Sequence, residues 1–202
     1  MARLQLNKSS LAREAAHLEI YRRFLPSLDL KRRQLMAERA IAIRALQDID
    51  RAIADLRRNV GEKLPMLANR DVDLAGLARV TEVSLGTENV VGTNLPVLDR
   101  IAIEKRPYAL LAKPHWVDAT ATLLAEMLEL QVHQQIARRR VALLERAVRT
   151  ITQRVNLFEK VLIPRTEAII RKIRIHLSDA EMAAVVRSKL SKRKHARQEG
   201  AG

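Results

Sequence analysis

Apolar residues recur along residues 11–60 with alternating steps of three and four, and the register never changes. A period of 3.5 residues held over so many turns is typical of a coiled-coil helix. We therefore predict a helix over 8–60, roughly 80 Å long at about 1.5 Å per residue. Fifteen positions form this stripe, and twelve of them are apolar: Leu11, Glu14, Leu18, Tyr21, Leu25, Leu28, Arg32, Leu35, Arg39, Ala42, Leu46, Ile49, Ile53, Leu56 and Val60.

Five residues mark special positions in or beside the first helix. Asn7 or Ser9 can cap its start. Pro26 removes one backbone hydrogen bond and is predicted to kink or break the helix just before it. Arg32 and Arg39 interrupt the apolar stripe, and two interpretations remain open. Their aliphatic stems can pack while the charged heads reach solvent, or they can fix the register of pairing or mark a partner's position.

A second stripe with the same stepping predicts another coiled-coil helix from residue 116. It comprises Trp116, Thr120, Leu123, Met127, Leu130, Gln134, Ala137, Val141, Leu144, Val148, Ile151, Val155, Phe158 and Leu162. Past Pro164 the stripe continues in a shifted register through Ile169 or Ile170, Ile173 and Leu177, which changes the supercoil locally. Ser178 and Asp179 resemble a new helix start. The tail at 185–202 is expected to fray.

The middle of the chain, 61–115, holds four of the six glycines and four of the six prolines, and both residue types break helices. Within it, residues 79–104 alternate apolar and polar side chains around the sequence NVVGTN. That alternation predicts a β-hairpin or short ribbon. Asn94 and Pro96 favour an edge position.

Two stripes separated by one irregular region predict that the chain folds back on itself. The predicted fold is dominated by α-helix: a long antiparallel two-helix coiled coil with a small β-hairpin in its middle. The predicted divisions are a first helix at 1–60, the middle region at 61–115, a second helix at 116–184 and a basic tail at 185–202. We expect Ile49 to lie near 144–151, and the N-terminal arm to lie alongside 165–185.

Composition supports long helices over an ordinary globular core. Phe, Tyr and Trp together number five, while 48% of residues are hydrophobic and 30% are charged, so aliphatic side chains must supply the buried area. The chain has no cysteine and therefore no disulfide or thiolate metal site. No apolar run approaches the ~20 residues of a membrane span, and the first residues lack a signal-peptide apolar block.

The formal net charge of +14 is unevenly distributed and indicates a partner. Residues 1–60, 137–174 and 185–202 contribute +6, +8 and +5, whereas 61–116 contribute zero. Nucleic acid, an acidic protein cavity or a membrane surface would each complement these basic regions. The triplet at 138–140 spans most of a helix circumference, so a solvated face is favoured over a binding patch.

Catalytic chemistry has no support in the sequence. The glycines at 86 and 92 lack the spacing and the lysine of a phosphate-binding loop, so a hairpin turn is the better interpretation. The five histidines are scattered, with no pair at metal-ligand spacing. We therefore expect no catalytic residues, no cofactor and no metal in this chain.

Three segments, taken together, are similar to the D subunit of V/A-type rotary ATPases. Residues 150–167, TITQRVNLFEKVLIPRTE, resemble the family's RRVNALE and V.IPRLE signature. Residues 28–35, LDLKRRQL, are similar to its LLK.KRD.L, and residues 89–96, NVVGTNLP, to its NVAGV.LP. The segments occur in the family's order and span most of the chain.

This resemblance implies a non-catalytic rotor shaft that couples ATP hydrolysis or synthesis to ion transport. The implied partners are the catalytic A and non-catalytic B subunits around the terminal halves, the F subunit nearer the hairpin, and the C (or d) subunit at the lower end. The implied location is cytoplasmic and peripheral to the membrane, without insertion into it and without nucleic acid. Our candidate partner contacts are Arg154, Asn156 and Arg165 in the signature, and Arg187, Lys189, Lys192, Arg193, Lys194 and Arg197 in the tail.

Two other classes of protein remain as alternatives. The charge would also suit a basic coiled coil that binds nucleic acid, although the basic regions lack the interleaved aromatics that single strands favour. A shaft-like partner of an export ATPase would share the two helices but should lack the 150–167 signature and the hairpin.

Overall fold

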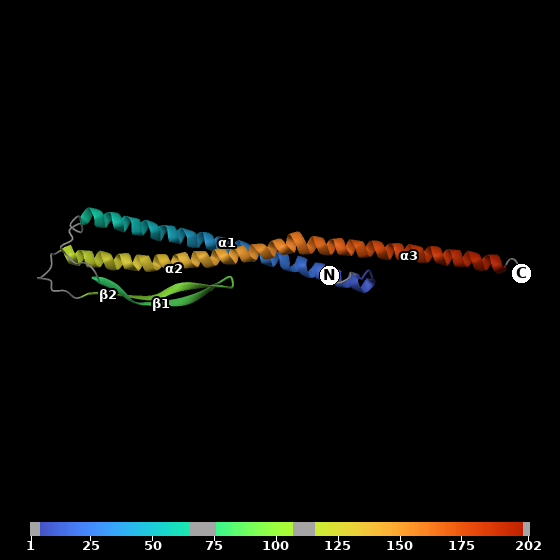
Figure 1. Ribbon diagram of the computed structural model, residues 1–202, viewed down its shortest axis with the longest axis horizontal. Helices are drawn as coiled ribbons and strands as arrows, with labels where there is room; N and C mark the ends of the chain where they lie inside the picture. Colours follow the sequence, from blue (N-terminus) through green and yellow to red (C-terminus); the bar gives the residue numbers. More distant parts are fainter. Residues whose placement is uncertain (1–4, 65–75, 107–115, 200–202) are drawn as a thin grey trace. The chain divides into compact units, whose positions relative to one another are not determined.

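The computed structural model describes the backbone of residues 5–64, 76–106 and 116–199, with side chains described as far as residue 193 (Figure 1). The parts of the predicted middle region at 65–75 and 107–115 lie outside the described residues. The fold is dominated by α-helix, with a small antiparallel β-hairpin between two long helical arms, which confirms the predicted fold class. The elements in order are α1 (Lys8–Lys63), β1 (Ala78–Val90), β2 (Thr93–Lys105), α2 (Trp116–Leu157), the π-helix η3 (Phe158–Leu162) and α3 (Ile163–Glu199).

The chain forms two compact units, and each contains parts of both arms. Unit 1 consists of Met1–Leu30 and Ile151–Gly202, and unit 2 consists of Lys31–Thr150. Unit 1 therefore holds the start of α1 with the end of α2, η3 and α3. Unit 2 holds the rest of α1, the hairpin and most of α2.

The apolar stripes form the interior of each unit. All fifteen predicted positions in α1, and all fourteen predicted positions from Trp116 to Leu162, are buried or half-buried. Leu35, Leu144 and Ile151 are among the most deeply buried. Arg32 and Arg39 are half-buried like their aliphatic neighbours, as expected for stems that pack along the seam.

Asn7 caps the start of α1. Its side-chain Oδ1 accepts a hydrogen bond from the backbone N–H of Ser10 at 2.7 Å, which satisfies one of the free donors of the first turn. Ser9, the other candidate, lies inside the helix. The prediction of a break at Pro26 is wrong, because α1 continues through this residue. Pro26 is exposed, so its lost backbone bond lies at the outer face of the helix, where water can satisfy the free carbonyl.

Pro164 is accommodated by the π-helix that precedes it. Proline has no N–H for the carbonyl four residues earlier, and its ring clashes with that carbonyl in a regular α-helix. In η3 the hydrogen bonds reach one residue further back, and the N–H of Ile163 donates to the carbonyl of Phe158. Such a π-turn carries one more residue than the α-turn it replaces.

The extra residue explains the predicted register shift. Continued without change, the stripe of α2 would pass through residues 165, 169 and 172, and Arg165 and Lys172 are exposed. The buried positions lie one residue later, at Thr166, Ile170 and Ile173. The predicted register shift is thus confirmed. It amounts to one residue, and Ile170 is the buried one of the two predicted isoleucines.

The helices within each unit run antiparallel. In unit 1, Lys8 pairs with Glu181 at 3.7 Å and Arg22 with Glu167 at 2.6 Å, which confirms that the N-terminal arm lies along 165–185. In unit 2, the side-chain amide of Gln134 donates to Asp50 at 2.5 Å. The prediction that Ile49 lies near 144–151 is therefore wrong by about ten residues, because the neighbour of Ile49 is held opposite residue 134.

The predicted hairpin is present, with β1 and β2 joined by a two-residue turn at Val91 and Gly92. Both turn residues have positive φ, 52° and 76°, as a type I′ turn requires. Asn89 supports the turn, because its side chain accepts from the N–H of Gly92 at 3.0 Å and donates to Asn94 at 2.7 Å. Two register irregularities, between Val80 and Glu82 and between Ser84 and Leu85, interrupt the ladder.

The C-terminal arm differs from its prediction. No new helix starts at Ser178, because α3 is continuous to Glu199. The expectation that the tail from 185 frays is likewise not met as far as Glu199. Every described side chain from 178 to 193 is nevertheless exposed, so the buried stripe has ended at Leu177 although the helix has not.

Deleting Lys160 together with Pro164→Ala should convert η3 to α-helix and leave Ile170 and Ile173 in the seam. Deleting the exposed Glu145 in the same P164A background should be far more damaging. Each residue of an α-helix turns the chain by about 100°. Removing one residue from a regular α-helix, which has no extra residue to lose, therefore rotates buried side chains into solvent. The loss is expected to be several kcal/mol, as for truncating buried leucines. Equal thermal midpoints by circular dichroism for the two deletions would contradict the one-residue surplus.

Val91→Asn should stabilise the hairpin by about 1 kcal/mol, because a β-branched residue is strained at positive φ and Asn is not. Gly92→Ala should destabilise it by a similar amount for the converse reason. Amide hydrogen exchange across residues 78–105 measures both effects. Two outcomes would show that this turn does not limit the stability of the hairpin. One is faster amide exchange in Val91→Asn, and the other is unchanged exchange in both variants.

Candidate partner-binding surfaces

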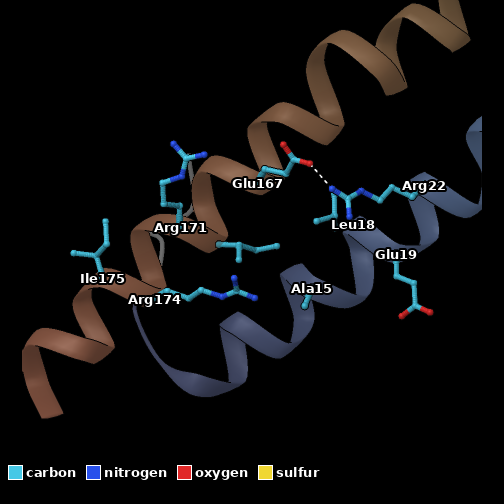
Figure 2. A pocket seen from close by; sticks show the side chains of 9 residues that line it. Ala15, Leu18, Glu19, Arg22, Glu167, Arg171, Arg174 and Ile175 are labelled. Carbon is cyan, nitrogen blue, oxygen red and sulfur yellow. Dashed lines mark hydrogen bonds and ion pairs between the residues drawn. The ribbon is translucent and has the colours of Figure 1, made fainter.

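A groove of about 570 Å³ lies between α1 and α3 in unit 1 (Figure 2). Aliphatic and alanine side chains line part of it, and charged side chains line the rest. Its nine lining residues are Ala15, Leu18, Glu19, Arg22, Glu167, Ile170, Arg171, Arg174 and Ile175. The groove exists because this section of α1 presents Ala15 beside Leu18, and a methyl group fills little of the space between two helices.

The charges of this groove are only partly neutralised. Arg22 pairs with Glu167 across it at 2.6 Å. Arg174 extends from α3 toward Ala15 (Figure 2), and no described residue pairs with it or with Arg171. A guanidinium over an aliphatic floor can bind a carboxylate while its stem stays packed. The groove is therefore suited to an acidic side chain from another protein.

The candidate residues of the tail lie on the exposed last turns of α3. Arg187, Lys189, Lys192 and Arg193 all have exposed side chains, and none of them pairs with a described residue. Lys194 and Arg197 belong to the same helix, but their side chains lie outside the described residues. Apolar side chains share this segment and are also exposed: Met182, Val185, Val186 and Leu190. A helix with both kinds of side chain uncovered can offer a partner apolar area as well as charge.

The candidates of the signature segment flank η3. Arg154 on α2 and Arg165 on α3 are exposed, whereas Asn156 is half-buried. Nothing in the geometry of the described residues joins these three side chains into one site. Their availability to a partner remains a prediction.

Arg140 has a role that the sequence analysis missed. Arg138 and Arg139 are exposed, as expected for a solvated face, but Arg140 is half-buried. Its guanidinium donates to the carbonyl of Pro96 at 3.1 Å and to Glu88 at 3.0 Å. The available signal was its position three residues after Ala137 and four before Leu144, which puts it beside the seam and apart from its two neighbours.

The described residues were compared with the requirements of a metal site and of a membrane span. Across residues 5–64, 76–106 and 116–193, no three side chains of His, Asp or Glu gather closely enough to hold a metal ion. Within the described helices, no segment has the length and apolar character needed to cross a membrane.

The chain matches known proteins over almost its whole length. The family model for the D subunit of ATP synthase matches residues 10–193. The V-type ATP synthase D subunit of Borreliella burgdorferi is 32% identical over 192 residues, covering 95% of each chain. The V-type ATP synthase D subunit of Chlamydia felis is 30% identical over 198 residues, covering 96% of this chain and 94% of the relative.

Proposed function

Because this chain belongs to the family of ATP synthase D subunits, we propose that it is the central rotor shaft of a V/A-type rotary ATPase. In this role it turns inside a catalytic hexamer and couples ATP hydrolysis or synthesis to ion transport through a membrane ring. The observation that carries the proposal is the family match across 10–193, together with two seams in which every predicted position is buried or half-buried.

The packing of the helices supports a mechanical role. A shaft must resist twisting, and torque passes along a helix pair only if neighbouring side chains cannot slide past one another. Side chains that interlock at every turn provide that resistance, whereas a flexible linker would absorb the rotation. The aliphatic stripes supply such contacts in each unit, with Leu35 and Leu144 buried in unit 2 and Ile173 buried in unit 1.

The proposed work of the chain needs no catalytic group of its own. It carries no phosphate-binding loop, so nucleotide turnover belongs to its partners. We propose the A and B subunits as the hexamer around the terminal arms, the F subunit beside the hairpin, and the C (or d) subunit below. The chain would then be cytoplasmic and peripheral to the membrane.

The exposed end of α3 is the proposed seat of the shaft in the hexamer. Its free cations and uncovered aliphatic side chains are suited to a collar with acidic and apolar surface, which could hold the shaft on its axis. Basic side chains at the surface of such a seat would still permit rotation, since long charged side chains do not lock into one pocket.

The purified chain should hydrolyse no ATP, yet should assemble with a catalytic hexamer lacking its shaft and restore ATP-driven ion transport. Hydrolysis and transport are measured together in reconstituted vesicles. Failure of the full-length chain to join the hexamer would overturn the rotor assignment.

Replacing the six tail cations by Gln should lower the number of ions transported per ATP while hydrolysis persists, because a loosely seated shaft slips. The six are Arg187, Lys189, Lys192, Arg193, Lys194 and Arg197. Removing 185–202 tests length together with charge, and replacing the exposed Arg138 and Arg139 by Gln controls for loss of charge elsewhere. An unchanged ratio in both tail variants would refute the seating role.

A further inference from the structure

The β1–β2 hairpin is fastened to α2 at its base. Leu77, just before β1, is buried against Val117 and Ala121 in one apolar cluster. At the end of β2, the ammonium group of Lys105 donates to Thr122 of α2 at 3.0 Å. These contacts fix the open end of the hairpin beside the first two turns of α2.

The hairpin is fastened to α2 a second time near its turn. Arg140 donates to both strands, to Glu88 of β1 and to the carbonyl of Pro96 in β2. Its side chain is 27% exposed, so the contact is shielded from much of the solvent. Leu95, beside Pro96, is only 1% exposed. The turn end is therefore held by a charged hydrogen-bonding group and a buried leucine.

The two attachments are spaced alike on both elements. On α2 they lie eighteen residues apart, from Thr122 to Arg140, which is about 27 Å at ~1.5 Å per residue. On β2 they lie nine residues apart, from Lys105 to Pro96, which is about 30 Å at ~3.3 Å per residue. The two spans are therefore nearly equal, and the strand runs along α2 between the attachments (Figure 1).

A cavity of about 380 Å³ lies among α1, α2 and β2, close to the Arg140 attachment, and three of its ten helical lining residues are alanines, at positions 42, 45 and 137. Pro96, Val97 and Leu98 of β2 form its third wall. The hairpin thus adds side chains from a third element to a cavity that the two helices leave partly unfilled.

We propose that the hairpin is a splint, clamped to α2 at both ends, which stiffens α2 between Thr122 and Arg140. A ribbon fixed at one end would move freely as the helix bends. A ribbon fixed at both ends must stretch or shear, and its backbone hydrogen bonds resist both. Arg140 is the positioning residue that closes the second clamp. The benefit of this stiffness to a rotating shaft rests on the proposed function, whereas the proposal that the hairpin stiffens α2 does not depend on that function.

Arg140→Ala should release the turn end and let α2 bend. Because the chain has no cysteine, spin labels can be placed specifically at Glu126→Cys and Glu145→Cys, both exposed on α2. The distribution of distances between the labels should broaden in Arg140→Ala. Amide exchange over 93–98 should also rise on the order of tenfold, the size expected for losing hydrogen bonds to a charged donor.

Arg139→Ala is the matched control, since Arg139 is exposed and no described residue pairs with it. Arg140→Lys keeps the charge but not the forked donor, and it should show an intermediate effect if Arg140→Ala fails to fold. The exchange Arg140→Glu with Glu88→Arg should restore part of the protection. Faster exchange without broader distances would refute the splint, and no change in either would refute the clamp. Both readouts use the isolated full chain, so they stand or fall independently of the rotor assignment.

Discussion

The pairing of two helices along one continuous apolar stripe is the constraint on which the rest of this structure depends. With so few aromatic side chains, the buried area comes from aliphatic residues at regular steps, and one residue out of phase turns a buried side chain by about 100°. Every interruption of a helix must therefore preserve the phase. Pro26 does so by lying on the exposed side of α1. Pro164 does so through η3, whose extra residue moves the stripe to Ile170 and Ile173.

Local features of the fold were predictable because they depend on neighbours in sequence. The stripes, the cap at Asn7 and the hairpin turn at Gly92 all arise from spacing or from the conformational preference of single residues. The axial register was not predictable in the same way. A heptad pattern looks alike after any shift by seven residues, so apolar positions would still meet. The contact that shows the register, between Asp50 and Gln134, joins residues far apart in sequence.

The candidate partner contacts show a different limit of sequence reasoning. After Leu177 the sequence suggested a new helix start at Ser178 and fraying from residue 185, whereas α3 continues to Glu199 and its described side chains from 178 to 193 are exposed. Helix formers such as Ala, Met, Arg and Lys can extend a helix without burial, so loss of periodicity predicts exposure better than it predicts the end of a helix. Which exposed cations contact a partner depends on the surface of this chain and on the surface of the partner. The sequence of this chain gives information about the first surface only. Arg140 illustrates the same point within the chain, because its role appears only once the hairpin is docked.

The hairpin lies beside a cavity of the helix pair that three alanines help to line. Alanines at 42, 45 and 137 bring little side-chain volume to the space between α1 and α2, and each missing contact lowers the resistance to shear between the helices. In a rod under torque, the softest section contributes most of the twist, so a brace placed there has a larger effect than the same brace elsewhere. β2 lines the cavity with Pro96, Val97 and Leu98, and its clamps at Thr122 and Arg140 lie on either side of position 137. In the proposed shaft, a ribbon tethered at this place would therefore oppose bending and twisting of α2 beside the cavity.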